Sequence, residues 1–383
     1  MGIEHQESLA FVQKKFSEYY SQPRVSVHNI HAREFGFGYL KKIDFRHKSF
    51  ASEAELNAFF KSDAPLFASH STAYYKFPSS RPMEKKVFLG SDLVFDIDKP
   101  FFGREHNHNE FLCLVCLDEV RRDALKLLKI LVDDFGFEER EIAANFSGNK
   151  GFHFHLNSEK VLGLSQDARR QLTEYLNGPE FLVSAEGRKA EEEKDFRGPS
   201  KNSLGWGKKF SVFAENFIKT ASVEDLKKKG LRGKGAEDFF ARKERVLDLI
   251  GKGRWLFAPK SFWDNLYSEF KRGNAVGVDA MVTLDLARLI RVPNSLHGDS
   301  GFMAKRLSPE ELEKFSVFGA LAFSNSQNEK TINVLPKTNI ALDFPERVEL
   351  EGGKPAEVSQ ALGVFLLCKN KAVLVLGEKS SGI

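Results

Sequence analysis

The spacing of apolar and polar residues along the chain predicts a mixed α/β protein. Apolar residues recur at helical spacing over 5–20 and 118–135, so we expect an amphipathic helix in each segment, with a shorter helix over 52–61. Over 25–50 apolar and polar residues alternate instead, which predicts antiparallel strands. The pattern favours sheets flanked by helices.

The stretch SDLVFDIDKP, residues 91–100, is predicted to form a short buried strand. Valine, phenylalanine and isoleucine fill it, and a Lys-Pro pair ends it. Side chains two apart on a strand leave from the same face, so Asp96 and Asp98 point one way while Phe95 and Ile97 point into the core.

A second alternating strand follows a turn in the stretch NFSGNKGFHFHLN, residues 145–157. His153 and His155 lie on one face of this strand. The turn 147–151 contains two glycines that let a backbone approach a phosphate closely, and Lys150 adds a positive charge. Such a turn alone is weak evidence for phosphate binding, but its combination with the Asp-x-Asp strand is much more specific.

The middle of the chain shifts to charge-rich helical segments broken by glycine-rich loops, and strand and helix patterns then return at 278–302. The pattern of apolar and polar residues over 314–376 predicts short strands and a final helix. We therefore expect an α/β (α+β) catalytic domain of mixed or antiparallel sheets flanked by helices, formed by 1–160 and 265–383. A mainly helical subdomain, 161–264, is inserted into it.

Composition narrows the class of protein. The 383 residues are 42% hydrophobic and 29% charged, which is enough for one large core with an inserted subdomain. The formal net charge of +4 permits an anionic partner without demanding one. No apolar run approaches the roughly 20 residues that span a bilayer, and the first residues resemble no secretion signal, so we expect a cytoplasmic protein without membrane contact.

The pair Asp96 and Asp98 is the first candidate site. Two like charges on an apolar strand are costly to bury unless a cation lies between them. One interpretation is that one carboxylate caps a turn and the other is solvated. The alternative is a divalent-metal site for phosphate chemistry, since carboxylate oxygens suit Mg²⁺ or Mn²⁺.

Four potential metal ligands lie in a motif at about 104–118, namely His106, His108, Cys113 and Cys116. The C-x-x-C spacing lets both thiolates approach one ion, and a closed set of four ligands favours a structural Zn²⁺. The alternative is that the cysteines are small core residues leading a helix, since phenylalanine and leucines flank them.

Five motifs, taken in order, resemble one known family. REFGF, DLVFDID, the C-x-x-C helix, SGNKGFHFH and VDAMVT followed by RLIRVPNSLHG are similar to those of the small catalytic subunit of archaeal and eukaryotic DNA primase, the archaeal branch being nearer. The resemblance spans about residues 33–302, and roughly the last eighty residues carry little of it.

The resemblance implies a primase-type fold and roles for particular residues. Asp96 and Asp98 match the family's metal-binding pair, and Asp279 matches its third carboxylate. The residues expected at the incoming nucleotide are Glu34, Arg46, Ser147, Asn149, Lys150, His153, Arg291 and His297. Asn149 and Lys150 stand where eukaryotic members carry two arginines, and Asp299 stands where the family usually has lysine.

The implied activity is that of a nucleotidyltransferase, a DNA-directed RNA or DNA polymerase that makes short primers on single-stranded DNA during replication. A 3′ hydroxyl would attack a nucleoside triphosphate, with two Mg²⁺ or Mn²⁺ ions and release of pyrophosphate. The implied partner is a primase large subunit in a heterodimer, acting at the nucleoid. Two alternatives stay open: a stand-alone primase-polymerase or repair polymerase, and a catalytically silent nucleic-acid-binding subunit.

Overall fold

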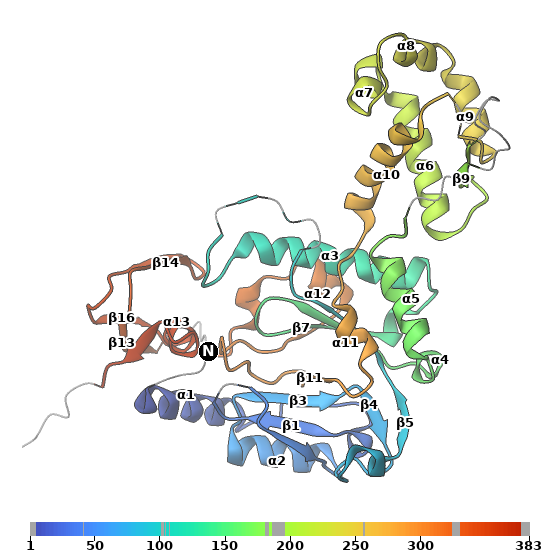
Figure 1. The fold of residues 1–383 in the computed structure, drawn as a ribbon. Coiled ribbons are helices and arrows are strands. Elements are labelled where there is room, and N and C mark those ends of the chain that lie inside the picture. The colour runs from blue at the N-terminus through green and yellow to red at the C-terminus, as the bar shows by residue number, and fades with distance from the viewer. Residues whose placement is uncertain are drawn as a thin grey trace, which may run out of the picture. The chain divides into compact units, whose positions relative to one another are not determined.

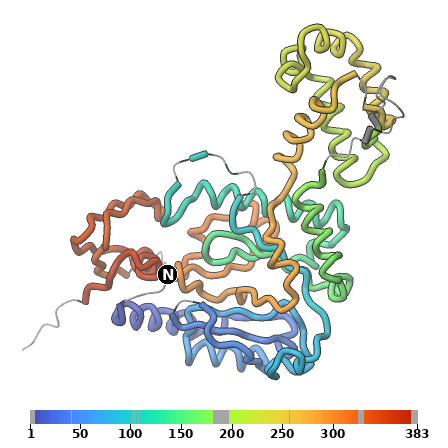
Figure 2. The backbone as a smooth tube through the Cα atoms, viewed as in Figure 1, coloured from blue at the N-terminus to red at the C-terminus, as the bar shows by residue number. Residues whose placement is uncertain are grey.

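The computed structural model describes residues 5–40, 42–100, 103, 105–106, 108–180, 184–185, 196–255, 257–323 and 330–376. The chain divides into a larger unit, 1–173 with 277–383, and a smaller unit, 174–276. Figure 2 follows the chain from the larger unit into the smaller one and back. The inserted subdomain predicted over 161–264 overlaps the smaller unit, and its independence as a folding domain stays a prediction.

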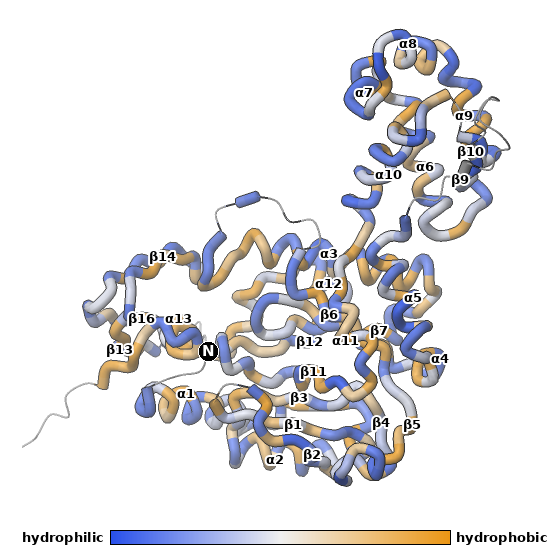
Figure 3. The backbone as a smooth tube through the Cα atoms, viewed as in Figure 1, coloured by the Kyte–Doolittle hydropathy of each residue, from blue (hydrophilic) through white to orange (hydrophobic). Residues whose placement is uncertain are grey.

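The first sheet of the larger unit has the strand order β11–β3–β1–β2, with antiparallel neighbours throughout. The strands are β1 (Phe35–Gly38), β2 (Phe45–Lys48), β3 (Phe67–Ser71) and β11 (Leu289–Arg291). Helices α1 (Gln6–Tyr19) and α2 (Glu53–Asp63) lie alongside this sheet (Figure 1), and hydrophobic and hydrophilic residues alternate along α1 (Figure 3). Both predicted N-terminal helices are confirmed.

The second sheet of the larger unit has the order β12–β7–β8–β6 and is also antiparallel. It contains β6 (Leu93–Ile97), β7 (Ile142–Phe146), β8 (Phe152–Leu156) and β12 (Arg306–Leu307). Helix α3 (Leu114–Asp133) turns Val120, Ala124 and Leu127 inward, as the 118–135 pattern predicts, but begins earlier, at Leu114. Helices α11 (Ala280–Leu284) and α12 (Pro309–Glu313) complete the surroundings of this sheet. The predicted mixed α/β fold class is confirmed.

The remaining elements of the larger unit are short. They are the hairpin β4 (Ala73–Tyr75) and β5 (Phe88–Ser91), helices α4 (Glu159–Leu162) and α5 (Gln166–Leu176), of which α5 ends in the smaller unit, and the 3₁₀ turns η1 (Ile30–Ala32), η2 (Met83–Lys86), η3 (Glu139–Glu141) and η4 (Val317–Ala320). Near the C-terminus are β13 (Thr331–Pro336), β14 (Ile340–Asp343), β15 (Arg347–Leu350), β16 (Ala356–Ser359), α13 (Gln360–Cys368) and β17 (Ala372–Leu374). Helix α13 is buried along its whole length.

The smaller unit is mainly helical, with its own aromatic core. It contains α6 (Gly205–Thr220), α7 (Val223–Lys228), α8 (Lys234–Ala241), α9 (Lys243–Gly251), α10 (Lys260–Asn274) and the short strands β9 (Ser184–Ala185) and β10 (Phe196–Arg197). Phe210 stacks on Trp255, and Trp263 meets Trp255 edge to face. Among the helices of the described ranges, none is long and apolar enough to cross a membrane.

The strand prediction over 25–50 is wrong for its first ten residues. Strands β1 and β2 lie in the second part, whereas 25–34 holds only the turn η1. Asn57 of α2 explains the difference: its Oδ1 accepts hydrogen bonds from the Arg24 and Val25 N–H groups at 3.0 Å each, and its amide donates to the Val25 carbonyl at 2.8 Å. A helix side chain takes the bonds that a neighbouring strand would supply, so the alternation reflects burial against α2.

Arg33 joins the two sheets from the inside. It is 1% exposed, pairs with Asp92 at 2.6 Å, and donates to the carbonyls of Ser71 and Thr72 at 2.9 and 2.7 Å. Its guanidinium also lies 3.7 Å from the centroid of the Tyr74 ring. Asp92 directly precedes β6, so this ion pair fixes the start of the strand that carries Asp96 and Asp98.

We expect Arg33→Met to lower the free energy of unfolding by about 3–5 kcal/mol, because Asp92 is left as a buried, unpaired charge. Urea denaturation followed by circular dichroism measures the loss. The double variant Arg33→Met with Asp92→Asn should recover part of it. A single variant as stable as the wild type would contradict the role of this ion pair.

Candidate functional site

Two carboxylates lie at the end of β6. Phe95 and Ile97 are fully buried, Asp96 is partly buried between them, and Asp98 is exposed just after the strand. Strand β8 pairs with β6 so that Asp96 is opposite His153, whose Nε2 lies 3.4 Å from Asp96 Oδ1. The alternation predicted for this strand therefore matches its burial.

Asp279 brings the third carboxylate to the same place. It caps the N-terminus of α11, where its Oδ1 accepts a hydrogen bond from the Met281 N–H at 2.9 Å. Its own backbone N–H donates to the Asp96 carbonyl at 2.9 Å. The chain thus ties Asp279 to the strand carrying Asp96, although 183 positions separate them in sequence (279 − 96).

The three carboxylates influence one another electrostatically. Burial, followed by the charges of Asp98 and Asp279, raises the pKa of Asp96 to about 7, against the opposing effect of Arg288. A carboxylate held near like charges is a group that a divalent cation would stabilise. The donor set, three carboxylates around a partly buried position, therefore fits divalent metal ions.

The turn 147–151 closes against this strand end. The Ser147 N–H donates to the Gly151 carbonyl at 2.8 Å, and Ser147 Oγ accepts from the N–H groups of Asn149 and Gly151 at 3.3 and 3.1 Å. A Cβ on Gly151 would lie 2.2 Å from the Ile97 carbonyl oxygen, so only glycine permits this approach. The Ser147 hydroxyl hydrogen is left to donate to a ligand.

His297 contacts the turn, and the charge of Arg291 acts on His297. A Cβ on Gly148, which has φ +81°, would lie 2.9 Å from His297 Cβ, so the turn and the histidine are in contact. The Asp299 N–H donates to His297 Nδ1 at 3.1 Å, which leaves the ring proton on Nε2. Burial, then Arg291 and Lys369, hold the pKa of His297 well below its ordinary value, so the ring is neutral.

Arg291 is the group with an open hydrogen bond. Its Nη1 is buried and has no hydrogen-bond partner among the residues that the structure describes. Burial lowers its pKa to about 10, so it stays charged at neutral pH. Burial, followed by the charges of Arg291 and Arg288, also lowers the pKa of His153 to about 3. A partly buried guanidinium with a buried, unpartnered Nη1 is suited to bind an anion.

Glu34 and Arg46 form a supporting layer on the first sheet. Glu34 is fully buried, and its carboxylate pairs with Arg46 at 3.0 Å, His47 at 3.2 Å and Lys86 at 3.4 Å. Arg46 is 40% exposed and also reaches the Ala287 carbonyl at 3.4 Å. The buried Glu34 carboxylate thus holds three basic side chains close together. The predicted contact of these residues with a nucleotide stays a prediction.

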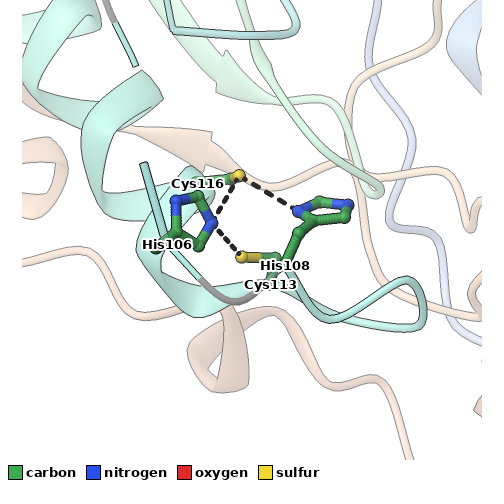
Figure 4. Close-up of side chains that lie close together, drawn as sticks. All are labelled: His106, His108, Cys113 and Cys116. Carbon is green, nitrogen blue, oxygen red and sulfur yellow. Dashed lines mark hydrogen bonds between the residues drawn. The ribbon is translucent and has the colours of Figure 1, made fainter. Parts of the chain in front are cut away.

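The predicted metal ligands of the 104–118 motif come together. His106, His108, Cys113 and Cys116 each offer one donor atom, and these atoms lie within 4.8 Å of one another. Figure 4 shows the four side chains pointing toward one another, with His106 Nε2 3.0 Å from Cys113 Sγ and 3.3 Å from Cys116 Sγ. The group could bind a metal ion. Ligand atoms around a tetrahedral zinc lie roughly 3.3–3.8 Å apart, so small shifts of these side chains would be enough to surround one.

The thiols of this group are electrostatically coupled. Burial opposes ionisation, but hydrogen bonds from the backbone of Cys116 and Asn109 lower the pKa of Cys113 to about 6. Burial and the neighbouring Cys113 thiolate raise the pKa of Cys116 to about 11. One thiolate therefore forms readily, and a bound cation would stabilise the second.

Sequence reasoning missed two basic residues at this site. Arg288 acts on Asp96 and His153, but it stands in the same segment as Arg291 and has no distinguishing pattern. Lys369 follows α13, and its Nζ donates to Asn149 Oδ1 at 3.1 Å. It lies in the C-terminal part of the chain, which the motifs do not cover, and no local signal marks it. Lys150 is exposed beside Asn149.

Comparisons of the sequence with a family model and with known proteins all point to one family. A family model described as DNA primase small subunit matches residues 95–309. The chain is 31% identical to the DNA primase small subunit PriS of Methanosarcina acetivorans, over 94% of this chain and 95% of that protein. It is 32% identical to PriS of Methanosarcina mazei over 87% of both chains, and 30% identical to PriS of Thermoplasma volcanium over 89% of this chain and 90% of that protein.

Without added divalent ions, we expect stability to fall as pH rises from about 4 to 7. Unfolded Asp96 loses its proton near its ordinary pKa of 3.8, whereas folded Asp96 keeps it until about pH 7, so the folded state binds the extra proton in this range. Asp96→Asn removes the dependence and should raise the thermal midpoint by a few degrees at pH 8 and little at pH 4.

Thermal unfolding of both proteins at pH 4 and 8 checks this. Asp343→Asn, which removes an exposed carboxylate on β14, is the matched control. A difference between Asp96→Asn and the wild type that is the same at both pH values would contradict the raised pKa.

Proposed function

This chain belongs to the DNA primase small-subunit family, and on that premise we propose that it is the catalytic subunit that synthesises primers on single-stranded DNA. The reaction is nucleotidyl transfer, in which a 3′ hydroxyl attacks the α-phosphate of a nucleoside triphosphate and pyrophosphate leaves. One observation carries the proposal: the charges of Asp98 and Asp279 act on Asp96, and His153 beside Asp96 is also within the influence of Arg291, whose Nη1 has no hydrogen-bond partner among the described residues.

Asp96, Asp98 and Asp279 would hold two divalent ions, Mg²⁺ or Mn²⁺. When bound, such ions lower the pKa of the attacking hydroxyl and stabilise the charge of the transition state. The protein's own contribution is to keep three carboxylates together against their repulsion. The N–H of Asp279 on the Asp96 carbonyl and the cap on Met281 supply that restraint.

The triphosphate would be bound on the opposite side by neutral and cationic donors. His297 carries its proton on Nε2 and donates it without the repulsion that a second cation would feel beside Arg291. Arg291 Nη1 supplies a charged hydrogen bond, and Ser147 supplies a hydroxyl from the turn. Held rigidly before the substrate arrives, these donors lower the cost of reorganisation during transfer.

The partners follow from the same proposal. Joining two free nucleotides requires both to be positioned without a primer helix, which costs entropy that a second protein can reduce. We therefore propose a heterodimer with a primase large subunit, with single-stranded DNA and nucleoside triphosphates as substrates. A protein with these substrates works in the cytoplasm, at the nucleoid.

We expect the purified protein to extend primers on single-stranded DNA with Mg²⁺ or Mn²⁺, and to start them more efficiently with its large subunit. Asp98→Asn should lower the rate about a thousandfold, because a lost metal ligand removes several kcal/mol of transition-state stabilisation. Incorporation of labelled ribo- and deoxynucleotides measures this, with Asp343→Asn as control. Synthesis by Asp98→Asn at the wild-type rate would contradict the proposal that Asp98 binds a catalytic metal ion.

We also propose that His106, His108, Cys113 and Cys116 bind a structural Zn²⁺. Two nitrogen and two sulfur donors in a closed set leave no ligand position for water, which fits a structural site. Cys113 is the N-cap of α3 and Cys116 lies in its first turn, so the ion would anchor the start of that helix. The helix in turn packs against β6 and β8.

We expect the wild-type protein to contain about one zinc per chain. The double variant Cys113→Ser with Cys116→Ser should lose the zinc, and its thermal midpoint should fall by several degrees. Elemental analysis of untagged protein measures the metal. Cys368→Ala is the matched control, since Cys368 is buried outside this group and should not affect the zinc content. Freshly purified wild-type protein without zinc would count against the site.

A further inference from the structure

Lys369 is a basic residue at the candidate site that neither the motifs nor the proposed function uses. It directly follows α13, a helix buried throughout, and its side chain is itself partly buried. The C-terminal end of a helix favours a cation, because the carbonyl dipoles point there. The Nζ atom donates to Asn149 Oδ1 at 3.1 Å, which brings α13 to the turn 147–151.

A cavity of about 170 Å³ lies in front of this lysine. Its walls come from four places: Asp98 after β6, Asn149 and Lys150 of the turn, the metal motif, and the end of α13 with Phe365 and Lys369. The cavity therefore connects Asp98, one of the three candidate metal ligands, to Lys369. Apolar side chains form much of the wall, so a charge inside it is poorly screened by water.

Three lysines line this cavity, Lys99, Lys150 and Lys369, and none of them forms an ion pair within the described ranges of the chain. Lys371, two residues further on, does pair, with Glu110 at 3.2 Å. Burial, then the charge of Lys150, lowers the pKa of Lys369, against the opposing charge of Asp299. Lys369 also contributes to the low pKa of His297, which shows that it acts on the same group of donors.

An ammonium group has three donors, and Lys369 uses one of them on the neutral Asn149 amide. Of the two carboxylates in the lining, Glu110 is paired with Lys371, so the lysines outnumber the remaining carboxylate, Asp98. The partly buried Lys369 feels this excess of positive charge most, and an anion in the cavity would offset it. The carboxylate of Asp98 lies on the metal side of the same cavity. An anion bound by Lys369 and by ions on Asp98 would reduce the excess of positive charge.

We propose that Lys369, together with Lys150, binds the pyrophosphate portion of the incoming nucleoside triphosphate. The inference rests on the proposed function and adds a binding site to it. The reacting α-phosphate must lie at the carboxylates, so the β- and γ-phosphates extend along the turn toward Asn149 and Lys369. A cation there stabilises the charge that develops on the leaving pyrophosphate. Asn149 holds the amine in place.

Two substitutions separate charge from shape. Lys369→Gln removes the charge and keeps an amide that can still bond to Asn149, while Lys369→Arg keeps the charge. Lys371→Gln is the control, because that lysine already has Glu110 as its partner. The measurements are KM for the nucleotide, the inhibition constant for inorganic pyrophosphate, template affinity and the thermal midpoint.

We expect Lys369→Gln to raise KM and the pyrophosphate inhibition constant by about tenfold or more, the loss of one charged hydrogen bond. Template affinity should be unchanged, Lys369→Arg should recover most of the loss, and Lys371→Gln should behave as the wild type. Wild-type constants in Lys369→Gln overturn the inference. A lower thermal midpoint with unchanged pyrophosphate inhibition also overturns it, because Lys369 would then only stabilise the end of α13.

Calorimetry with inorganic pyrophosphate tests the same contact without catalysis. Wild-type protein should bind pyrophosphate about tenfold or more tightly than Lys369→Gln, and equal affinities overturn the inference. Should the wild type make no primers but still show this difference, the proposed function fails while the anion site stands. If the wild type makes primers but Lys369→Gln binds pyrophosphate as tightly as the wild type, the proposed function stands and the anion site fails.

Discussion

The candidate site depends on one close approach of two backbones. The turn 147–151 can touch the end of β6 only because Gly151 lacks a side chain, since a Cβ there would lie 2.2 Å from the Ile97 carbonyl oxygen and 2.8 Å from Asp98 Cα. The same turn leads into β8, whose pairing with β6 sets His153 opposite Asp96. A local steric requirement thus brings the carboxylates at the end of β6 next to the turn 147–151 and to His153 of β8.

Two groups at the candidate site, the Asp96 carboxylate and the Arg291 guanidinium, lack, among the described residues, partners that would stabilise them fully. Asp96 is destabilised by burial and by two carboxylates, and Arg291 keeps a buried donor without a partner in the described part of the chain. A cation would relieve the first and an anion the second. Ionisable groups with strongly shifted pKa values of this kind cluster at functional sites. The Arg33–Asp92 ion pair holds the other end of β6.

The sequence predicts the elements whose pattern depends on residues close together in the chain. It does not predict features that depend on contacts with residues far away in the chain. The alternation in β6 and β8, the periodicity of α3 and the spacing of the metal motif each lie within a few residues, and each recovers its element or group. The segment 25–34 alternates like a strand because it is buried against α2, and no pattern within it reveals Asn57 as the partner. Arg33 stands among sheet-like residues, yet lies inside. Burial against another element is a tertiary property that periodicity alone does not encode.

Lys369 illustrates the same limit in the functional site. It lies 220 residues from Asn149 in the sequence and outside the segment 95–309 that the family model matches. What brings it to the turn is the packing of α13, whose Phe365 stacks near Phe302 at 5.4 Å between ring centroids. Phe302 follows closely after His297, so the aromatic contact links the C-terminal helix to the segment that carries His297. The C-terminal region therefore takes part in the geometry of the site through hydrophobic packing, and the position of one cation follows from that packing.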